Sequence, residues 1–139
     1  MSAEIVRLSD KRPESEKVTI NLGYVDLGHI DLLVREGYYS NRTDFIRTAI
    51  RNQLSTQADA VKQSVGRHNL EVGLRRYSKS ELQQMRKAGE KLRVQVLGLC
   101  IVDEDVSEEL ALAVIESITV LGALQIRPAL RTALSQRIR

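Results

Sequence analysis

Residues 17–54 hold the most regular pattern in the chain, and they read KVTINLGYVDLGHIDLLVREGYYSNRTDFIRTAIRNQL. In residues 17–22, apolar and polar side chains alternate strictly, as expected for a half-buried strand. Val18, Ile20 and Leu22 point to one side of such a strand, and Gly23 ends the alternation. The pattern predicts one short strand that has a single apolar face.

Two amphipathic helices are predicted after this strand, over residues 25–36 and 40–54, because apolar residues recur there at helical spacing. Gly37 suits the position that follows a helix end, and Ser40 suits an N-cap. The apolar positions are Leu27, Ile30, Leu33 and Val34 in the first helix, and Phe45, Ile46, Ala49, Ile50 and Leu54 in the second.

One strand and two helices of this length cannot bury a core by themselves, and a lone strand has two unpaired edges. The economical solution is a dimer in which two copies of strand 17–22 pair antiparallel above four helices. Lys17, Thr19 and Asn21 then form the outer face of a two-stranded ribbon, doubled by symmetry. Such a ribbon fits the major groove of B-DNA, and lysine, threonine and asparagine can all contact base edges there.

With these elements in place, residues 17–54 resemble the ribbon-helix-helix family of bacterial transcription regulators, in the CopG/Arc/MetJ superfamily. The strongest part of the match is GYYSNRTDFIRTAIR at residues 37–51. The resemblance implies that Lys17, Thr19 and Asn21 read bases. It also implies that the N-terminus of the second helix anchors a DNA phosphate, and free N–H groups at a helix start suit an anion. The matching phosphate-anchoring residues are Ser40, Asn41, Arg42 and Thr43.

Three further segments surround this unit. Residues 1–16 are polar and charged and predict a flexible arm. Residues 55–91 hold few large apolar side chains and a net charge of +4, which predicts a basic helical connector. Residues 92–139 predict a small α/β C-terminal domain for oligomerisation or sensing. The fold class is therefore mainly α with short β.

The C-terminal domain is expected to contain two strand-helix units. The segments LRVQVLGLCIV at 92–102 and ITVLGALQI at 118–126 predict buried strands, each followed by a helix. Val-Leu-Gly occurs at 96–98 and again at 120–122, which indicates an internal repeat. Because two repeats bury little surface, this domain is expected to pair with another copy of itself.

Composition excludes several protein classes. The chain has 139 residues, a net charge of +3 and one cysteine, Cys100, which has no partner for an internal disulfide. Neither a long apolar run nor a secretory leader is present, so a cytoplasmic protein, bound to the bacterial nucleoid when on DNA, is expected. No contact with a membrane is expected. Residues 1–54 carry 8 basic and 8 acidic side chains, so the proposed DNA-reading unit is neutral.

No cofactor, metal or catalytic activity is predicted. The two histidines, His29 and His68, are isolated, and residues 92–139 offer only Cys100 as a soft metal ligand. The acidic residues 103–105 are expected to form a solvated turn. No phosphate-binding glycine loop, nucleophile elbow or zinc-protease motif occurs.

The expected function is sequence-specific binding of double-stranded DNA by a homodimer, as a repressor or autoregulator. The C-terminal domain could join two such dimers into a tetramer. Two alternatives use the same DNA-binding unit: an antitoxin whose C-terminal region neutralises a toxin, and an accessory protein of plasmid partition or conjugation. An antitoxin tail is usually disordered until it binds, whereas residues 92–139 are patterned for folding.

Overall fold

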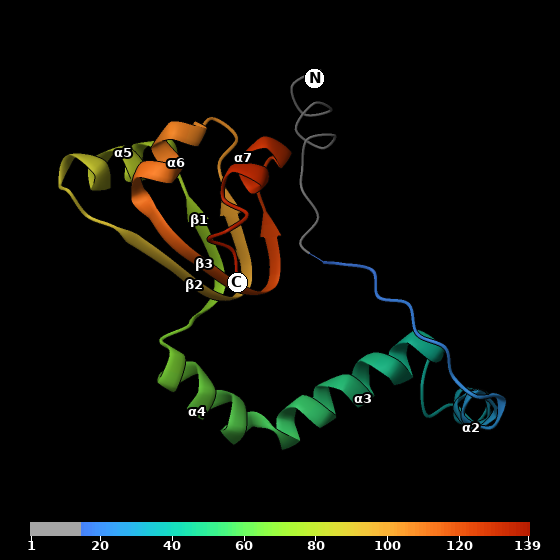
Figure 1. Ribbon diagram of the computed structural model, residues 1–139. Coiled ribbons are helices and arrows are strands. Elements are labelled where there is room, and N and C mark those ends of the chain that lie inside the picture. The colour runs from blue at the N-terminus through green and yellow to red at the C-terminus, as the bar shows by residue number, and fades with distance from the viewer. Residues whose placement is uncertain (1–14) are drawn as a thin grey trace, which may run out of the picture. The chain divides into compact units, whose positions relative to one another are not determined.

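The computed structural model describes residues 15–139, so nearly all of the predicted arm lies outside the described residues. The described chain divides into two compact units (Figure 1). We call Ser15–Ser64 the head unit and Val65–Arg139 the tail unit. Helix α4 (Ala58–His68) contains the boundary between them.

The head unit contains α2 (Tyr24–Arg35) and α3 (Arg42–Thr56), within two residues of the predicted helix bounds. Gly37 takes φ +86° directly after α2, a conformation in which a side chain would be strained. The Tyr39 and Phe45 rings then meet edge to face, with centroids 5.0 Å apart. The turn thus brings the start of α3 beside α2.

The strand predicted over 17–22 is not formed in the single chain. Residues 16–23 belong to no helix and pair with no other strand, and they run as an irregular segment into α2 (Figure 1). A strand exists only when its backbone groups bond to a neighbour, and one chain offers this segment no neighbour. The alternating pattern is therefore present without the strand pairing that it predicts.

The tail unit is built on a three-stranded sheet. Its strands are β1 (Glu71–Tyr77), β2 (Leu92–Val102) and β3 (Ile115–Gln125), all parallel and in the order β1-β2-β3. Each strand is followed by a helix: α5 (Lys79–Lys87), α6 (Glu108–Val114) and α7 (Pro128–Ala133). The three helices lie on the same side of the sheet (Figure 1).

The core of the tail unit lies between this sheet and its helices. On β2, Val94, Val96, Cys100 and Val102 alternate with less buried neighbours and are fully enclosed, so one strand face points inward. Burial raises the pKa of the Cys100 thiol to about 11. Each helix also supplies core residues, among them Leu82, Leu110, Val114 and Leu130.

A row of glycines crosses the sheet. Gly73, Gly98 and Gly122 are register partners, and their φ angles are +115°, +137° and +122°. A Cβ atom at Gly98 would overlap the carbonyl oxygen of Gly73, and one at Gly122 would overlap that of Gly98. The strands are curved, and the helices lie on the inner side of the curve (Figure 1). Gly98 and Gly122 are required for both their backbone angle and their lack of a side chain, and Gly73 for its backbone angle.

The predicted helical connector over 55–91 differs from the structure in its second half. Residues 71–77 form β1 and residues 79–87 form α5, and both belong to the tail unit. The tail therefore holds three strand-helix units where two were predicted. Gly73 lies 25 residues before Gly98, which continues the internal repeat, but the polar side chains Glu71, Arg75 and Arg76 obscure the strand pattern.

Arg75 and Arg76 explain how charged side chains fit in this strand. Arg75 lies over the ring of buried Tyr77, 4.2 Å from its centroid, and pairs with Glu81 of α5. Arg76 pairs with Asp103 after β2. Both guanidinium groups therefore have partners, so a strand rich in arginine can join a folded sheet.

The glycine row predicts two different costs for the same substitution. Gly98→Ala should destabilise the tail unit by about 2–4 kcal/mol, because backbone strain is added to a steric overlap. Gly73 has a positive φ as well, so Gly73→Ala adds the same kind of backbone strain. Its cost should be about 1–2 kcal/mol smaller, because the space around Gly73 is open. Hydrogen exchange at β2 amides measures both values, and equal losses would refute the steric argument.

Candidate nucleic-acid interface

The three predicted base-reading residues lie together on the segment before α2. Lys17, Thr19 and Asn21 are all exposed. Val18 and Ile20, which were expected on the buried side, are also exposed, by 79% and 62% of their surface. In a single copy, this segment therefore has no buried face that is distinct from its solvent face.

With one exception, the other apolar side chains of the head unit are covered only in part. Ile30 is its only buried residue among residues 15–64. Val25, Leu32, Ile50 and Leu54 are each more than half exposed. A folded domain does not normally leave this much of its apolar stripe in water. The head unit consequently lacks the surface that would complete its core.

The start of α3 is closed by a reciprocal pair of hydrogen bonds. The Asn41 side chain accepts from the Asp44 backbone N–H at 2.8 Å, and the Asp44 carboxylate accepts from the Ser40 N–H at 2.9 Å. The N-cap is therefore Asn41, and the prediction of Ser40 in that role was wrong by one residue. Both are good capping residues, and the backbone geometry selects between them.

Two backbone donors remain open at this helix end. The N–H groups of Arg42 and Thr43 are the first two of α3, and within the described chain they have no acceptor. They point out of the helix start, where the dipole is positive. The Asp44 carboxylate in the same turn opposes part of that field. This end can therefore hold an anion through the backbone more than through net charge.

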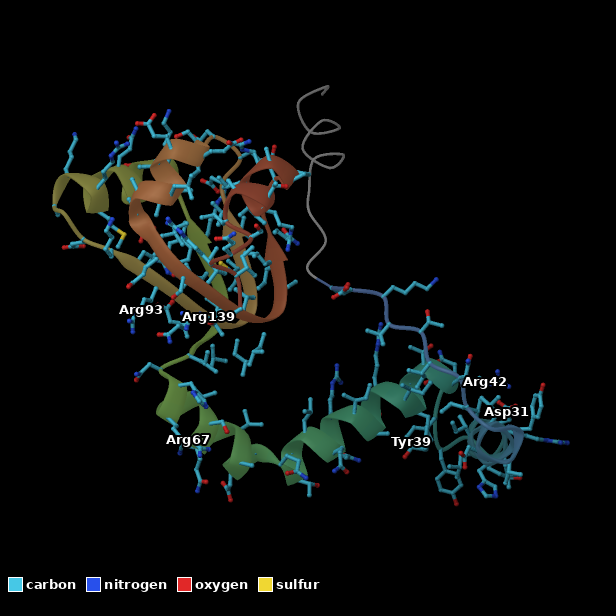
Figure 2. All side chains as sticks on the ribbon, in the orientation of Figure 1. Asp31, Tyr39, Arg42, Arg67, Arg93 and Arg139 are labelled. Atoms are coloured by element: carbon cyan, nitrogen blue, oxygen red, sulfur yellow. The ribbon has the colours of Figure 1, made fainter. Side chains whose placement is uncertain are left out.

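Arg42, a predicted phosphate anchor, already has a partner in the single chain. Its Nε donates to Oδ1 of Asp31 and its Nη2 donates to Oδ2, both at 2.8 Å, so the pair joins α3 to α2 (Figure 2). The hydrogen bonds from Arg42 lower the pKa of the Asp31 carboxyl below its usual value. The same pair raises the pKa of Arg42. The bidentate fork thus positions the start of α3, and its Nη1 edge is left for another acceptor.

A shallow hollow runs from this helix start along α3. It is lined by polar side chains at helical spacing, including two arginines that the sequence analysis did not place in the site. Both Arg47 and Arg51 are exposed. The sequence indicates them by spacing: Arg47 lies seven residues after Ser40, and Arg51 lies four residues after Arg47. This spacing puts all three residues on one helix face. The full lining is Ser40, Asn41, Thr43, Asp44, Arg47, Thr48 and Arg51.

No hydrogen bond or ion pair within the described chain joins the segment 17–22 to the start of α3. Three of the predicted site residues thus lie on this segment and four at the helix end, with no bond between the two sets.

The remaining chemistry of the chain offers fewer candidates. Within residues 15–139, no three His, Cys, Asp or Glu side chains gather as a metal ion would require. Over the same residues, none of the helices is long and apolar enough to cross a membrane.

Comparison with known proteins agrees with the geometry of the head. The model of the ribbon-helix-helix transcriptional regulator family matches residues 13–131, which confirms the resemblance seen in the sequence. An uncharacterized protein of Methanocaldococcus jannaschii, MJ1679, is 37% identical over 49 residues, which are 35% of this chain and 50% of that protein. The chain thus spans about half the length of this curated relative. No solved structure matches the present chain.

The capping pair leads to a first test at this site. Asn41→Ala should lower the stability of the head by about 1 kcal/mol, because it removes the side-chain acceptor of the Asp44 amide. Ser40→Ala is the matched control and should cost little, since the bond at Ser40 uses its backbone. Urea unfolding followed by circular dichroism compares them, and a larger loss for Ser40→Ala would contradict the assignment.

The ion pair leads to a second test. Because the folded-state pKa of Asp31 is lowered, its contribution is fully present above the unfolded pKa of about 3.9. That contribution is lost as the pH falls through the folded pKa. Asp31→Asn should therefore flatten the loss of head stability below about pH 4. An unchanged slope in Asp31→Asn would contradict the pairing.

Proposed function

This chain belongs to the ribbon-helix-helix transcriptional regulator family, and we propose that it acts as a homodimer whose paired 17–22 segments enter the major groove of DNA. The observation that supports the dimer best is the uncovered apolar surface of the head, with Val18 79% and Ile20 62% exposed. A second copy supplies both the missing strand and the missing core surface. Burying a side chain of this size is worth about 1.5–3 kcal/mol.

Base reading is proposed for the outer face of that ribbon. When Val18 and Ile20 turn toward the helices, strict alternation turns Lys17, Thr19 and Asn21 outward. Lysine can donate to guanine O6 and N7, asparagine can pair with adenine N6 and N7, and threonine can contact a polar edge or a thymine methyl. Six side chains per dimer then read the sequence.

Phosphate anchoring is proposed for the start of α3. The open N–H groups of Arg42 and Thr43 suit a phosphate oxygen, and the side chains of Ser40 and Asn41 lie beside them. The Nη1 edge of Arg42 adds a charged donor that Asp31 has already oriented. Because few charges take part, the dependence of binding on salt should be shallow.

Repression or autoregulation is the proposed role, in the cytoplasm and at the bacterial nucleoid when bound. The antitoxin alternative is disfavoured by the fold of the tail, since residues 71–133 form an ordered sheet with helices, whereas antitoxin tails are usually disordered before binding. A role in plasmid partition or conjugation uses the same head and leads to the same test of DNA binding.

The proposal predicts the behaviour of Asn21→Ala. Duplexes selected from a random library by the wild-type protein define its preferred site. On that site Asn21→Ala should lose about 1–3 kcal/mol of binding and accept other bases at one position. Val18 and Ile20 stay unchanged, so dimerisation is preserved. A variant that binds the selected site with unchanged affinity and preference would refute the ribbon assignment.

A phosphate-contact variant provides the contrast. Thr43→Pro removes one of the two open N–H groups in the first turn of α3, where no hydrogen bond of the helix is lost. It should weaken binding to every duplex by a similar factor and leave the base preference unchanged. Affinity measured at several salt concentrations separates the two effects, and a change of base preference would contradict phosphate anchoring.

A further inference from the structure

The side of the tail sheet that faces away from its helices carries an apolar patch, flanked along the strands by Gln95, Thr119, Arg76 and Gln125. On β2, the inward residues Val94, Val96 and Cys100 alternate with others that must point the opposite way. By register the same holds for β1 and β3. We call this surface the outer sheet face, and it consists of Val72, Leu74, Leu97, Leu99, Ile101, Leu121 and Ala123.

Six of the seven residues form two continuous rows across the strands, and Ile101 lies beside them on β2. Val72, Leu97 and Leu121 are register partners, as are Leu74, Leu99 and Ala123. No polar side chain interrupts these two rows. Val72, Leu74 and Leu121 are 68%, 58% and 55% exposed, and they are three of the four large apolar side chains of residues 71–139 that remain exposed. The fourth, Leu112, lies on α6.

A parallel sheet with one bare face is unusual. Parallel sheets occur almost only with both faces covered, and their strands are apolar on both sides for that reason. β2 has this composition, with Leu97, Leu99 and Ile101 on the side away from the helices. In the tail unit α5, α6 and α7 cover the other side only (Figure 1). The sequence therefore provides for a second covering layer.

The charges at the edge of the outer sheet face favour a second copy of the chain as that layer. Arg76 at one end is paired with Asp103 at 2.5 Å, and Arg93 toward the other end is paired with Glu116 at 3.2 Å. Each pair is neutral, so two such faces can meet without repulsion between like charges. The same neutrality argues against DNA, which requires uncompensated cations.

We propose that the outer sheet face packs against the same face of a second copy of this chain. Three strands about 4.8 Å apart and five residues of about 3.3 Å each give an apolar face of roughly 14 by 17 Å. A stable interface buries about 800 Å² per partner, so this contact is weak alone. The proposed head dimer, on which this step rests, holds the second copy at an effective concentration in the millimolar range.

The test uses the full chain with its head association removed. Val18→Asp and Ile20→Asp together place charges on the apolar side of the ribbon, and both side chains are already exposed in one copy. Sedimentation equilibrium from about 10 µM to about 1 mM covers the tethered concentration. The double variant should still form dimers at the upper end. Adding Leu121→Glu should reduce that association at least tenfold.

Two matched variants guard against misfolding. Leu112→Glu makes the same kind of change on α6, outside the outer sheet face, and should leave the association unchanged. Leu74→Glu repeats the test on a second strand, and circular dichroism checks that each variant is folded. A monomer at every concentration in the double variant would overturn the proposal and leave the face to a partner of another kind. Equal loss with Leu112→Glu would overturn it as well.

The outcome for DNA is measured in parallel. Leu121→Glu in the otherwise wild-type chain should keep the base preference of the head. Tail association without any sequence-specific DNA binding refutes the ribbon proposal alone. Sequence-specific binding with a monomeric tail refutes the outer-face contact alone.

Discussion

Apolar side chains remain in contact with water unless a second surface covers them, and this constraint governs both units of the chain. In the head, one strand-forming segment and two helices leave only Ile30 buried. In the tail, the helices enclose one side of the sheet and leave Val72, Leu74 and Leu121 exposed. The head lacks a partner strand and the tail lacks a covering layer. We propose that a second copy of the chain meets both needs.

Within the tail, the glycine row determines how the strands approach. At Gly98 and Gly122, a backbone carbonyl of the neighbouring strand occupies the space of a missing Cβ. The strands are curved, and α5, α6 and α7 lie on the inner side of the curve (Figure 1). The other face of the sheet has no layer from its own unit. That uncovered face is the surface proposed for assembly.

The helix-end site shows a similar division of roles. Asn41 and Asp44 close the first turn of α3, and Arg42 holds that turn against Asp31 of α2. What remains for a ligand is the pair of open N–H groups and one edge of a guanidinium. A neutral head can still present an anion site in this way, because the donors come from the backbone and their direction is fixed by the cap.

The helices of the head could be predicted because their apolar spacing and turn residues lie within one local segment. Strand 92–102 was predicted to the residue for the same reason. β1 was missed because Glu71, Arg75 and Arg76 look unlike a buried strand, and only their partners Tyr77, Glu81 and Asp103 make them compatible with one. The N-cap was placed one residue early because Ser40 and Asn41 have equal propensity, and the backbone chooses between them.

The sequence by itself determined the family, the alternation of Lys17, Thr19 and Asn21 with apolar neighbours, and the repeat of glycine at intervals of 24–25 residues. These features depend on the order of residues along the chain. Only the tertiary structure decided that Arg42 binds Asp31, that three strand-helix units and not two form the tail, and that one sheet face is bare. Those features depend on contacts between residues distant in sequence, which no local pattern records.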